Sequence, residues 1–412
     1  MTMNEDTAIL NLRQIKNFLY TARHNSVSRA AEELNRSQSA VSRSIQELEN
    51  GLGASLFDRS VNGVTLTVFG KALFERGEYV EQVFIQAREA MLATESGKKQ
   101  VRKNSPVFRM DISGRRLAGF IALAEQQTFA RAALTLGTTT AAVRITIREM
   151  ESALGVPLFD KGPWGMSLTI HGKTLYKHAR LAGNELRRAV DDIASLSGIK
   201  QGHVRVGTMA FSQTRILPIA INALLKEHPD IRLSTVEGPY DSLMSSLLCG
   251  DIDFILGALR TPEPEEGQKQ EVLLEDNLSL IVRGDHPLLK QKRIRPGDLL
   301  DYGWVLPPED APARQLFEEV CKTMKLQLPA DIVETRSHSI TRGLLMESDR
   351  ISVLSRHQIY YEEEFRMLRV LPLELAGTSR PIGVTCRSQT TLSPSAALLL
   401  EHVRGVIDQL RL

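Results

Sequence analysis

Polar side chains that can hydrogen-bond the edges of nucleic-acid bases gather in a short segment around residue 40. A glutamine such as Gln38 can pair with adenine in the major groove and an arginine such as Arg43 with guanine, while serine hydroxyls contact bases or phosphates. If the segment is one helix, its solvent side carries the groups expected to read bases: Ser37, Gln38, Ser39, Ser42, Arg43 and Gln46. The alternative is an ordinary solvated helix surface.

The elements that must position those side chains are two short helices joined by a tight turn. Ser26–Leu34 predicts a capped amphipathic helix, and Asn35 after it tolerates the left-handed turn conformation. Small Ala31 lets this helix cross closely over the next one, as in a helix-turn-helix. The second helix is predicted to begin near Ser37 and to place on one face Val41, Ile45, Leu48 and Leu52.

A short β-hairpin is expected to follow the second helix. Leu56–Arg59, then Gly63 and the pair Leu66-Thr67, have the pattern of two short strands around a turn. This wing favours a winged helix-turn-helix over a generic helical hairpin, which is the alternative for the helices by themselves. We expect Arg29 and Arg59 to bind phosphates, because such contacts position a protein on DNA without specifying sequence.

The same pattern recurs 102 residues further along the chain. Between Leu12 and Lys71, 22 of 60 positions are identical to the residue 102 positions later, and no gap is needed. For example, Arg29-Ala30-Ala31 corresponds to Arg131-Ala132-Ala133. A register held over this length indicates a duplicated domain.

The second copy differs from the first at the positions expected to read bases. Thr140 replaces Gln38, Arg144 replaces Ser42, and Ile145 replaces Arg43, whereas the apolar face is kept. The second copy is therefore either a reader with altered specificity or a copy retained for dimerisation and backbone contact. Its candidate DNA contacts are Arg131, Thr139, Thr140, Arg144 and Arg148.

A long amphipathic helix follows each copy, over Lys71–Ala93 and Lys173–Leu196. Such a helix would leave an apolar stripe in water if isolated, so we expect it to pack against another helix or back on its own domain. Between the copies, residues 96–106 are polar and basic. They predict either a solvated tether or a segment that lies on DNA phosphates.

Residues 18–71 resemble the N-terminal domain of the LysR-type transcriptional regulators. They carry the SQ-x-AVSR core of that family's recognition helix at 37–43 and the LEnxLGxxLFxR ending at 48–59. From Ser113 onward the chain resembles a complete regulator of this family. The resemblance implies linker-helix dimerisation and a C-terminal effector domain, and it makes residues 1–112 an extra copy that departs from the usual single one.

We therefore expect an α+β multidomain chain with two winged helix-turn-helix domains, their linker helices, and a bilobed α/β effector domain resembling type 2 periplasmic binding proteins. The predicted boundaries are 1–95 and 113–200 for the two DNA-binding units, 96–112 for the basic linker, and 201–412 for the effector domain. Within the effector domain we place lobe I at about 203–281 and 371–412, and lobe II at about 282–370.

Strand and helix patterns alternate after Gly202, which predicts a mostly parallel sheet covered by helices in each lobe. A cleft between two such lobes can close on a small molecule beyond the carboxyl ends of the strands. The resemblance implies that a sugar or an aromatic acid binds there, although Phe211 fits a core position equally well. The implied effector-binding residues are Met209, Ala210, Phe211, Pro307, Pro308, Ala313, Ser337, His338 and Ser339.

The charge of the chain is divided between its halves. Residues 1–202 hold 27 Lys/Arg and 20 Asp/Glu, so 27 − 20 = +7, whereas residues 203–412 hold 24 and 29, so 24 − 29 = −5. A basic half joined to a mildly acidic half is typical of a nucleic-acid module fused to another kind of module.

Several classes of protein are excluded or disfavoured. No apolar run is long enough to span a membrane, and the N-terminal residues do not form a signal peptide. The three cysteines lie far apart, and phosphate-loop, zinc-protease and hydrolase motifs are missing. We expect a cytoplasmic protein with no catalytic site, no cofactor and no metal.

The sequence therefore predicts a LysR-type regulator that binds promoter DNA and a small-molecule effector. It would associate with itself as a dimer or tetramer through the linker helices and effector domains, and it would contact RNA polymerase. The alternative is a solute-binding, receptor-like protein whose helical half serves mainly for oligomerisation.

Overall fold

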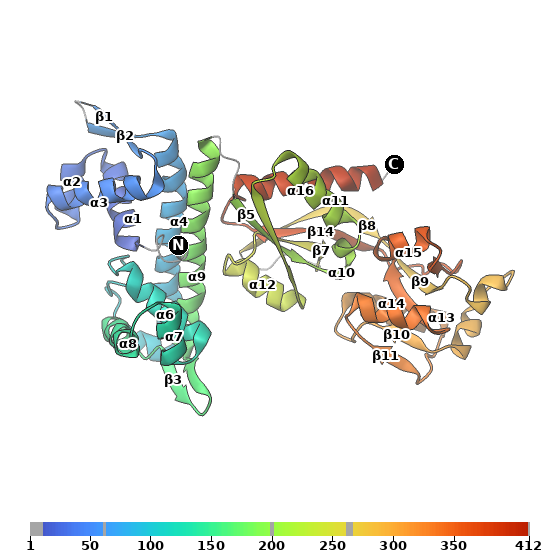
Figure 1. Cartoon of the computed structure of the whole chain (residues 1–412). Helices are drawn as coiled ribbons and strands as arrows, with labels where there is room; N and C mark the ends of the chain where they lie inside the picture. The colour runs from blue at the N-terminus through green and yellow to red at the C-terminus, as the bar shows by residue number, and fades with distance from the viewer. Residues whose placement is uncertain (1–10, 61–62, 198–201, 261–266, 411–412) are drawn as a thin grey trace.

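The computed structural model describes residues 11–60, 63–197, 202–260, 267–410 of the chain. The ends of the predicted domains at residues 1, 200, 201 and 412 lie outside these ranges. Two small helical units and two long helices form the N-terminal half, and two α/β lobes form the C-terminal half (Figure 1).

We name the two small units the first head, residues 12–66, and the second head, residues 114–168. Each has three helices and a two-stranded antiparallel hairpin, as the winged helix-turn-helix prediction requires. The first head comprises α1 (Leu12–His24), α2 (Val27–Glu33), α3 (Gln38–Leu52), β1 (Phe57–Ser60) and β2 (Gly63–Leu66). The second head comprises α6 (Gly114–Gln126), α7 (Phe129–Thr135), α8 (Thr140–Leu154), β3 (Phe159–Gly162) and β4 (Gly165–Leu168).

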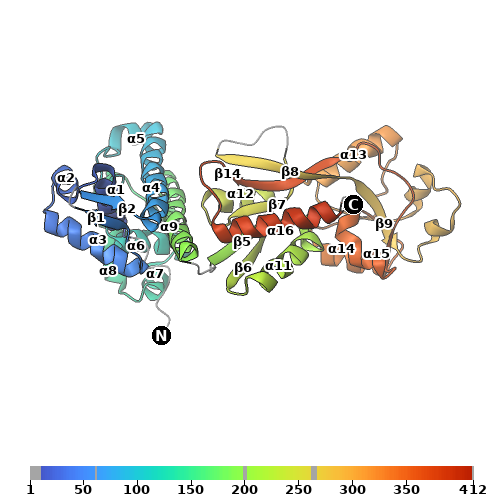
Figure 2. The same cartoon turned by 90° about the horizontal axis from the view of Figure 1, so that it is seen from above.

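The two long helices, α4 (Val68–Ala93) and α9 (Ile170–Leu196), pack against each other within the chain (Figures 1 and 2). Arg76 in the first half of α4 pairs with Glu185 in the second half of α9 at 2.9 Å, and Ser96 just after α4 lies 3.2 Å from His171 at the start of α9. The pair is therefore antiparallel. The apolar stripes predicted to need a partner bury one another, except that Leu196 is 48% exposed.

The segment between the heads is anchored to them by its buried residues while most side chains of 96–106 stay exposed, so it is not the free tether that the sequence suggested. It contains α5 (Glu95–Gln100), and its apolar side chains Val107 and Phe108 join the same core as both heads. The Arg102 amide donates to the Leu154 carbonyl at 2.8 Å, and Asp111 accepts hydrogen bonds from Lys16 and Arg36. The sequence prediction rested on the basic residues of this segment and overlooked the apolar residues of 101–112.

Each lobe of the C-terminal half contains a five-stranded sheet. In lobe I the order is β6-β5-β7-β14-β8, and in lobe II it is β11-β10-β12-β9-β13. Lobe I comprises β5 (Gly202–Thr208), α10 (Ala210–Gln213), α11 (Ile216–Glu227), β6 (Ile231–Glu237), α12 (Tyr240–Leu248), β7 (Phe254–Ala258), β8 (Gln268–Asp276), β14 (Arg380–Arg387) and α16 (Pro394–Leu410).

Lobe II lies between β8 and β14 in the chain. It comprises β9 (Leu278–Arg283), η1 (Pro287–Lys290), η2 (Pro296–Asp301), β10 (Trp304–Leu306), α13 (Pro312–Met324), β11 (Ile332–Glu334), α14 (His338–Met346), β12 (Ile351–Ser355), η3 (Arg356–Ile359), α15 (Tyr360–Glu364) and β13 (Leu368–Val370).

The prediction of mostly parallel sheets holds for four of the five strands in each lobe, whereas β14 in lobe I and β9 in lobe II run antiparallel to both of their neighbours. One boundary of the predicted lobes is corrected. The predicted boundary at residue 282 falls inside β9, which belongs wholly to lobe II, and Leu371 and Leu375 also pack in the core of lobe II. Among the described residues, no helix combines the length and the apolar character needed to cross a bilayer.

Candidate nucleic-acid interface and ligand-binding domain

The turn that presents α3 is built as the sequence predicts. Asn35 adopts a left-handed conformation with φ of 52°, and the Arg36 amide donates to the Ala31 carbonyl at 2.9 Å. The Ser37 hydroxyl then accepts from the Ala40 amide at 3.2 Å and caps the N-terminus of α3. These bonds fix the helix that carries the candidate reading residues.

The candidate reading residues of the first head point to solvent. Ser37, Gln38 and Ser39 are exposed, as are Arg43 and Gln46, whereas Ser42 is half-buried. The Arg43 guanidinium donates to Glu47 one turn later at 3.0 Å, and its side chain remains 82% exposed. Exposed surface pairs of this kind are weak, so Arg43 can exchange Glu47 for a base. Both phosphate candidates, Arg29 and Arg59, are also exposed.

The second head repeats this scaffold. Gly137 replaces Asn35 with φ of 61°, and the Thr139 hydroxyl caps α8 by accepting from Ala142 at 3.2 Å. A glutamate near the end of each recognition helix binds the start of the wing. Glu49 in the first head and Glu151 in the second each accept a hydrogen bond from a backbone amide there. The predicted buried face of α8 is confirmed: Val143, Ile147, Met150 and Leu154.

The exposed face of the second head has different chemistry. The guanidinium of Arg144 lies 4.4 Å from the centre of the Phe129 ring, an attractive cation–π arrangement on the protein itself. Ile145 is 57% exposed at the position of Arg43. Glu149, which corresponds to Glu47, pairs instead with Arg116 at 2.8 Å. The other candidate contacts of this head are all exposed: Arg131, Thr139, Thr140 and Arg148.

Two further apolar side chains on the second head were missed by sequence reasoning. Leu134 on α7 is 83% exposed and Trp164 in the turn of the second wing is 93% exposed. They correspond to Glu32 and Asn62 of the first copy. Comparing the two copies position by position outside the recognition helix would have revealed both substitutions.

Both recognition helices lie on one side of the molecule. In Figures 1 and 2, α3 and α8 lie on the side of the helix pair that faces away from the effector domain. The two wings lie at opposite ends of the helix pair in Figure 1. One chain thus presents two heads in a fixed relative arrangement.

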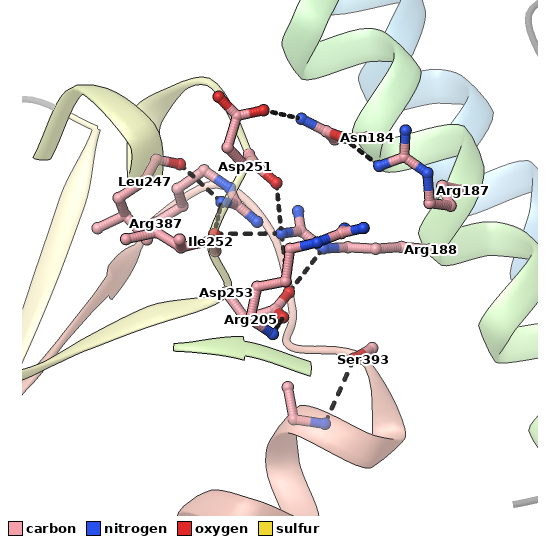
Figure 3. A network of polar contacts seen from close by, with 12 residues as sticks. Asn184, Arg187, Arg188, Arg205, Leu247, Asp251, Ile252, Asp253, Arg387 and Ser393 are labelled. Carbon is pink, nitrogen blue, oxygen red and sulfur yellow. Dashed lines mark hydrogen bonds and ion pairs between the residues drawn. The ribbon is translucent and has the colours of Figure 1, made fainter. Parts of the chain in front are cut away.

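A buried ionic network joins the helix pair to lobe I (Figure 3). Arg188 of α9 binds Asp253 next to β7 at 2.9 Å, and Arg387 of β14 donates to the Leu247 carbonyl at 2.7 Å. Glu185, which is fully buried, contacts Arg76, Arg188 and Arg387. A buried carboxylate among three guanidinium groups is compensated, and removing one partner of such a pair is strongly destabilising.

Burial shapes the protonation of this junction. Desolvation raises the pKa of Asp191 to about 6, and the neighbouring Asp192 and Asp253 carboxylates add to the rise. Desolvation, with the positive charge of Arg188, lowers the pKa of Arg387 to about 10. Sequence reasoning missed the junction. Its one available signal was Glu185 and Arg188, two charges next to the apolar stripe of α9.

The implied effector residues of lobe I follow β5, as expected. The Met209 amide donates to the Leu256 carbonyl at 3.2 Å, and Ala210 is exposed at the start of α10. Phe211 is only 3% exposed and packs in the core of lobe I, while its ring makes an edge contact with His357 of lobe II. Phe211 therefore occupies the core position that the sequence left open.

The implied effector residues of lobe II follow β10 and β11. Pro307 and Pro308 are half-buried after β10, and Ala313 lies in the first turn of α13. Ser337 caps α14 by accepting the Ile340 amide, and Ser339 is exposed. Both ring nitrogens of His338 are buried and make no hydrogen bond to any described residue, and burial lowers the pKa of this histidine.

A cavity lies elsewhere, at the seam between the lobes, and none of the nine implied effector residues lines it. The guanidinium of Arg215 from lobe I lies 3.6 Å from the centre of the Tyr360 ring of lobe II. Arg356 pairs with Glu363 at 2.7 Å. The cavity has a volume of about 730 Å³ and is lined by Arg215, Arg356, His357, Tyr360, Glu363, Glu364, Arg366 and Arg369.

Comparison with protein families divides the chain in the same way. Residues 12–71 and 115–173 each match the family described as bacterial regulatory helix-turn-helix protein, lysR family. Residues 197–408 match the LysR substrate binding domain. Both copies of the duplicated domain therefore match the same helix-turn-helix family.

Curated relatives differ in how much of the chain they cover. The HTH-type transcriptional regulator GalR of Pseudomonas putida is 35% identical over 404 residues, which are 98% of this chain and 99% of that protein. The uncharacterised HTH-type transcriptional regulator YdcI of Escherichia coli is 29% identical over 304 residues, which are 74% of this chain and 98% of that protein. GalR therefore matches the tandem arrangement, and YdcI matches only part of it.

Among solved structures, the LysR family transcriptional regulator CbnR covers 71% of this chain and 98% of its own, with 22% identity and a TM-score of 0.52. CbnR has also been solved in complex with its target DNA. This likeness supports the fold. The names of the relatives confirm that the chain is a regulator rather than an enzyme.

Proposed function

Because the chain belongs to the LysR family of DNA-binding transcriptional regulators with a substrate-binding domain, we propose that one chain engages promoter DNA through both of its heads. The observation that carries this proposal is the exposure of α3 and α8 on the side of the helix pair that faces away from the effector domain. The receptor-like alternative is disfavoured, because both copies match the helix-turn-helix family.

The first head supplies direct base reading. Gln38 reads adenine and Arg43 reads guanine in the major groove, while the serines of α3 contact bases or phosphates. Arg29 and Arg59 bind phosphates and set the register of the head on the duplex. In the second head, the same phosphate-binding role belongs to Arg131 and Arg148, and the hydroxyls of Thr139 and Thr140 face the groove.

The effector domain binds a small molecule, a sugar or an aromatic acid, between its lobes. The residues that follow β5, β10 and β11 are the first candidate for its site. The arginine-lined cavity of about 730 Å³ is a second candidate, favoured by its volume and by four guanidinium groups against two carboxylates. An aromatic carboxylate suits the second candidate, because guanidinium groups bind carboxylates and stack on rings.

Several partners follow from a regulatory role. Self-association through the effector domains would place more than one pair of heads on a promoter, and contact with RNA polymerase would turn DNA occupancy into a change in transcription. The protein acts in the bacterial cytoplasm, where its DNA target is accessible.

DNase footprinting of the full-length protein on DNA upstream of its own coding region tests the first head. Point variants are preferable to truncation, because removing α4 would expose the buried stripe of α9. We expect protection that survives moderate salt and is lost in Arg43→Ala, with Arg293→Ala at an exposed position of lobe II as the matched control. Protection that is equal in Arg43→Ala and the unchanged protein would refute base reading by Arg43.

Thermal-shift measurements with a panel of sugars and aromatic carboxylates test the two ligand sites. A ligand that binds the native state raises Tm by mass action. Loss of the shift in Ser337→Ala assigns the strand-end site, whereas its loss in Arg369→Ala assigns the arginine-lined cavity.

A further inference from the structure

The two heads are locked together in one chain and present different reading faces. The α4–α9 pair, the Arg76–Glu185 ion pair and the packed segment 101–112 hold them in one core. A dimer of single-headed subunits has two identical faces related by symmetry, and its operator mirrors that symmetry. Here the covalent duplication removes the requirement that the two faces be identical.

The difference between the faces is greatest at one equivalent position. Arg43 in the first head is a cation that can form two hydrogen bonds with guanine. Ile145 in the second head is apolar, 57% exposed, and can contact the C5-methyl group of thymine. The first head should therefore prefer guanine, and the second head thymine, at the equivalent position of the two half-sites.

The surroundings of the two side chains reinforce this difference. Arg43 pairs weakly with Glu47 on α3, whereas the equivalent Glu149 in the second head pairs with Arg116. Arg144, next to Ile145, lies against Phe129 at 4.4 Å. A charged side chain held on the protein surface leaves the apolar group free to approach the groove.

We propose that one chain recognises an asymmetric DNA site, in which the first head reads a half-site with guanine at the Arg43 position and the second head reads a half-site with thymine at the Ile145 position. This inference rests on the proposed function of the heads. The order of the two half-sites then fixes the direction in which the effector domain lies on the promoter. A pair of chains would bind two copies of this asymmetric site.

Selection of bound duplexes from a random 40-base-pair pool by the full-length protein tests the proposal. We expect two unlike half-sites in one order, at a spacing near one helical turn, about 10 base pairs, or a multiple of it. An inverted repeat of two identical half-sites would overturn the asymmetry while leaving DNA reading intact. No enriched sequence at all would refute DNA reading itself, and this inference with it.

A reciprocal pair of variants tests the assigned position. In Ile145→Arg, the thymine preference of the second half-site should change to guanine, while in Arg43→Ile the guanine preference of the first should change to thymine. On the selected site, replacing the thymine by uracil removes only the methyl group, and we expect affinity to fall several-fold for the unchanged protein but not for Ile145→Arg. A selected motif that is unchanged by Ile145→Arg would show that this face does not read DNA and would overturn the proposal.

Circular dichroism and Tm measurements serve as folding controls for both variants. The substituted side chains are exposed, so their Tm values should match that of the unchanged protein. Should Ile145→Arg lower Tm, Ile145→Ala offers a second route, because it shortens the apolar contact without adding charge. Ile145→Ala should reduce the discrimination between thymine and uracil without creating a guanine preference.

Discussion

The first head carries Gln38, Ser42 and Arg43 where the second carries Thr140, Arg144 and Ile145, yet both heads have the same three helices and wing. Four local features that hold the fold occur in both heads: the capping hydroxyl, the left-handed turn residue, the glutamate that binds the wing, and the aromatic pair between the first helix and the wing. The comparison teaches that packing constrained the duplicate more than surface chemistry did.

Core truncation should affect the two heads equally and strongly. Phe18 and Phe120 are fully buried equivalents, each in tilted or edge-on ring contact with the phenylalanine that opens its wing. We expect Phe18→Ala and Phe120→Ala each to destabilise its head by about 3–5 kcal/mol, because a large cavity is left. Hydrogen exchange of the full-length protein, resolved by peptide, measures each head separately. A much smaller effect in one head would break the equivalence of the two cores.

Truncation at the reading position should affect the two heads unequally. Arg43→Ala removes a bidentate hydrogen-bond donor, so we expect a loss of about 1–3 kcal/mol in specific binding. Ile145→Ala removes apolar contact alone and should cost less. Fluorescence anisotropy with one selected duplex compares both variants. Equal losses would mean that the second face also reads through hydrogen bonds.

The phosphate contacts should be alike in both heads. Arg29 and Arg131 occupy equivalent exposed positions, so Arg29→Ala and Arg131→Ala should each reduce the slope of log affinity against log salt by about 1. Titrations at four salt concentrations measure these slopes. If only Arg29→Ala changes the slope, the second head does not touch the backbone at this point.

The two long helices should differ slightly in how they make stability depend on pH. Asp191 of α9 has its pKa raised to about 6 by burial, whereas Glu89 at the equivalent place in α4 is 65% exposed in its side chain. The folded state therefore binds a proton that the unfolded state releases near pH 4, and this stabilisation is lost as the pH rises through about 6. Asp191→Asn keeps the group neutral.

We expect Asp191→Asn to raise stability at pH 7.5 by about 1 kcal/mol after allowance for partial solvent exposure, and to leave it unchanged at pH 4. Thermal melts at the two pH values measure this. Glu89→Gln is the control and should change stability at neither pH. An Asp191→Asn variant that is less stable at pH 7.5 would mean that the carboxylate is ionised and paired.

Much of the chain could be predicted from local pattern. The offset of 102 residues, the capping residues Ser37 and Thr139 and the turn residues Asn35 and Gly137 are sequence features because they act over a few neighbouring residues. The predicted alternation of strands and helices after Gly202 is likewise found. Mixed sheet order was not predictable in this way, because strand pairing joins residues more than 100 positions apart.

By itself, the amino-acid sequence determined that the chain has two winged helix-turn-helix copies, that their reading faces differ, and that a bilobed domain follows. Only the tertiary structure decided that α4 and α9 pack against each other within one chain, that the apolar residues of 101–112 join the core of the heads, and that Glu185 is buried among three arginines. The physical reason is that the sequence shows which apolar stripes and charged side chains require a packing or ionic partner. Which partner each one finds depends on the three-dimensional arrangement of distant segments.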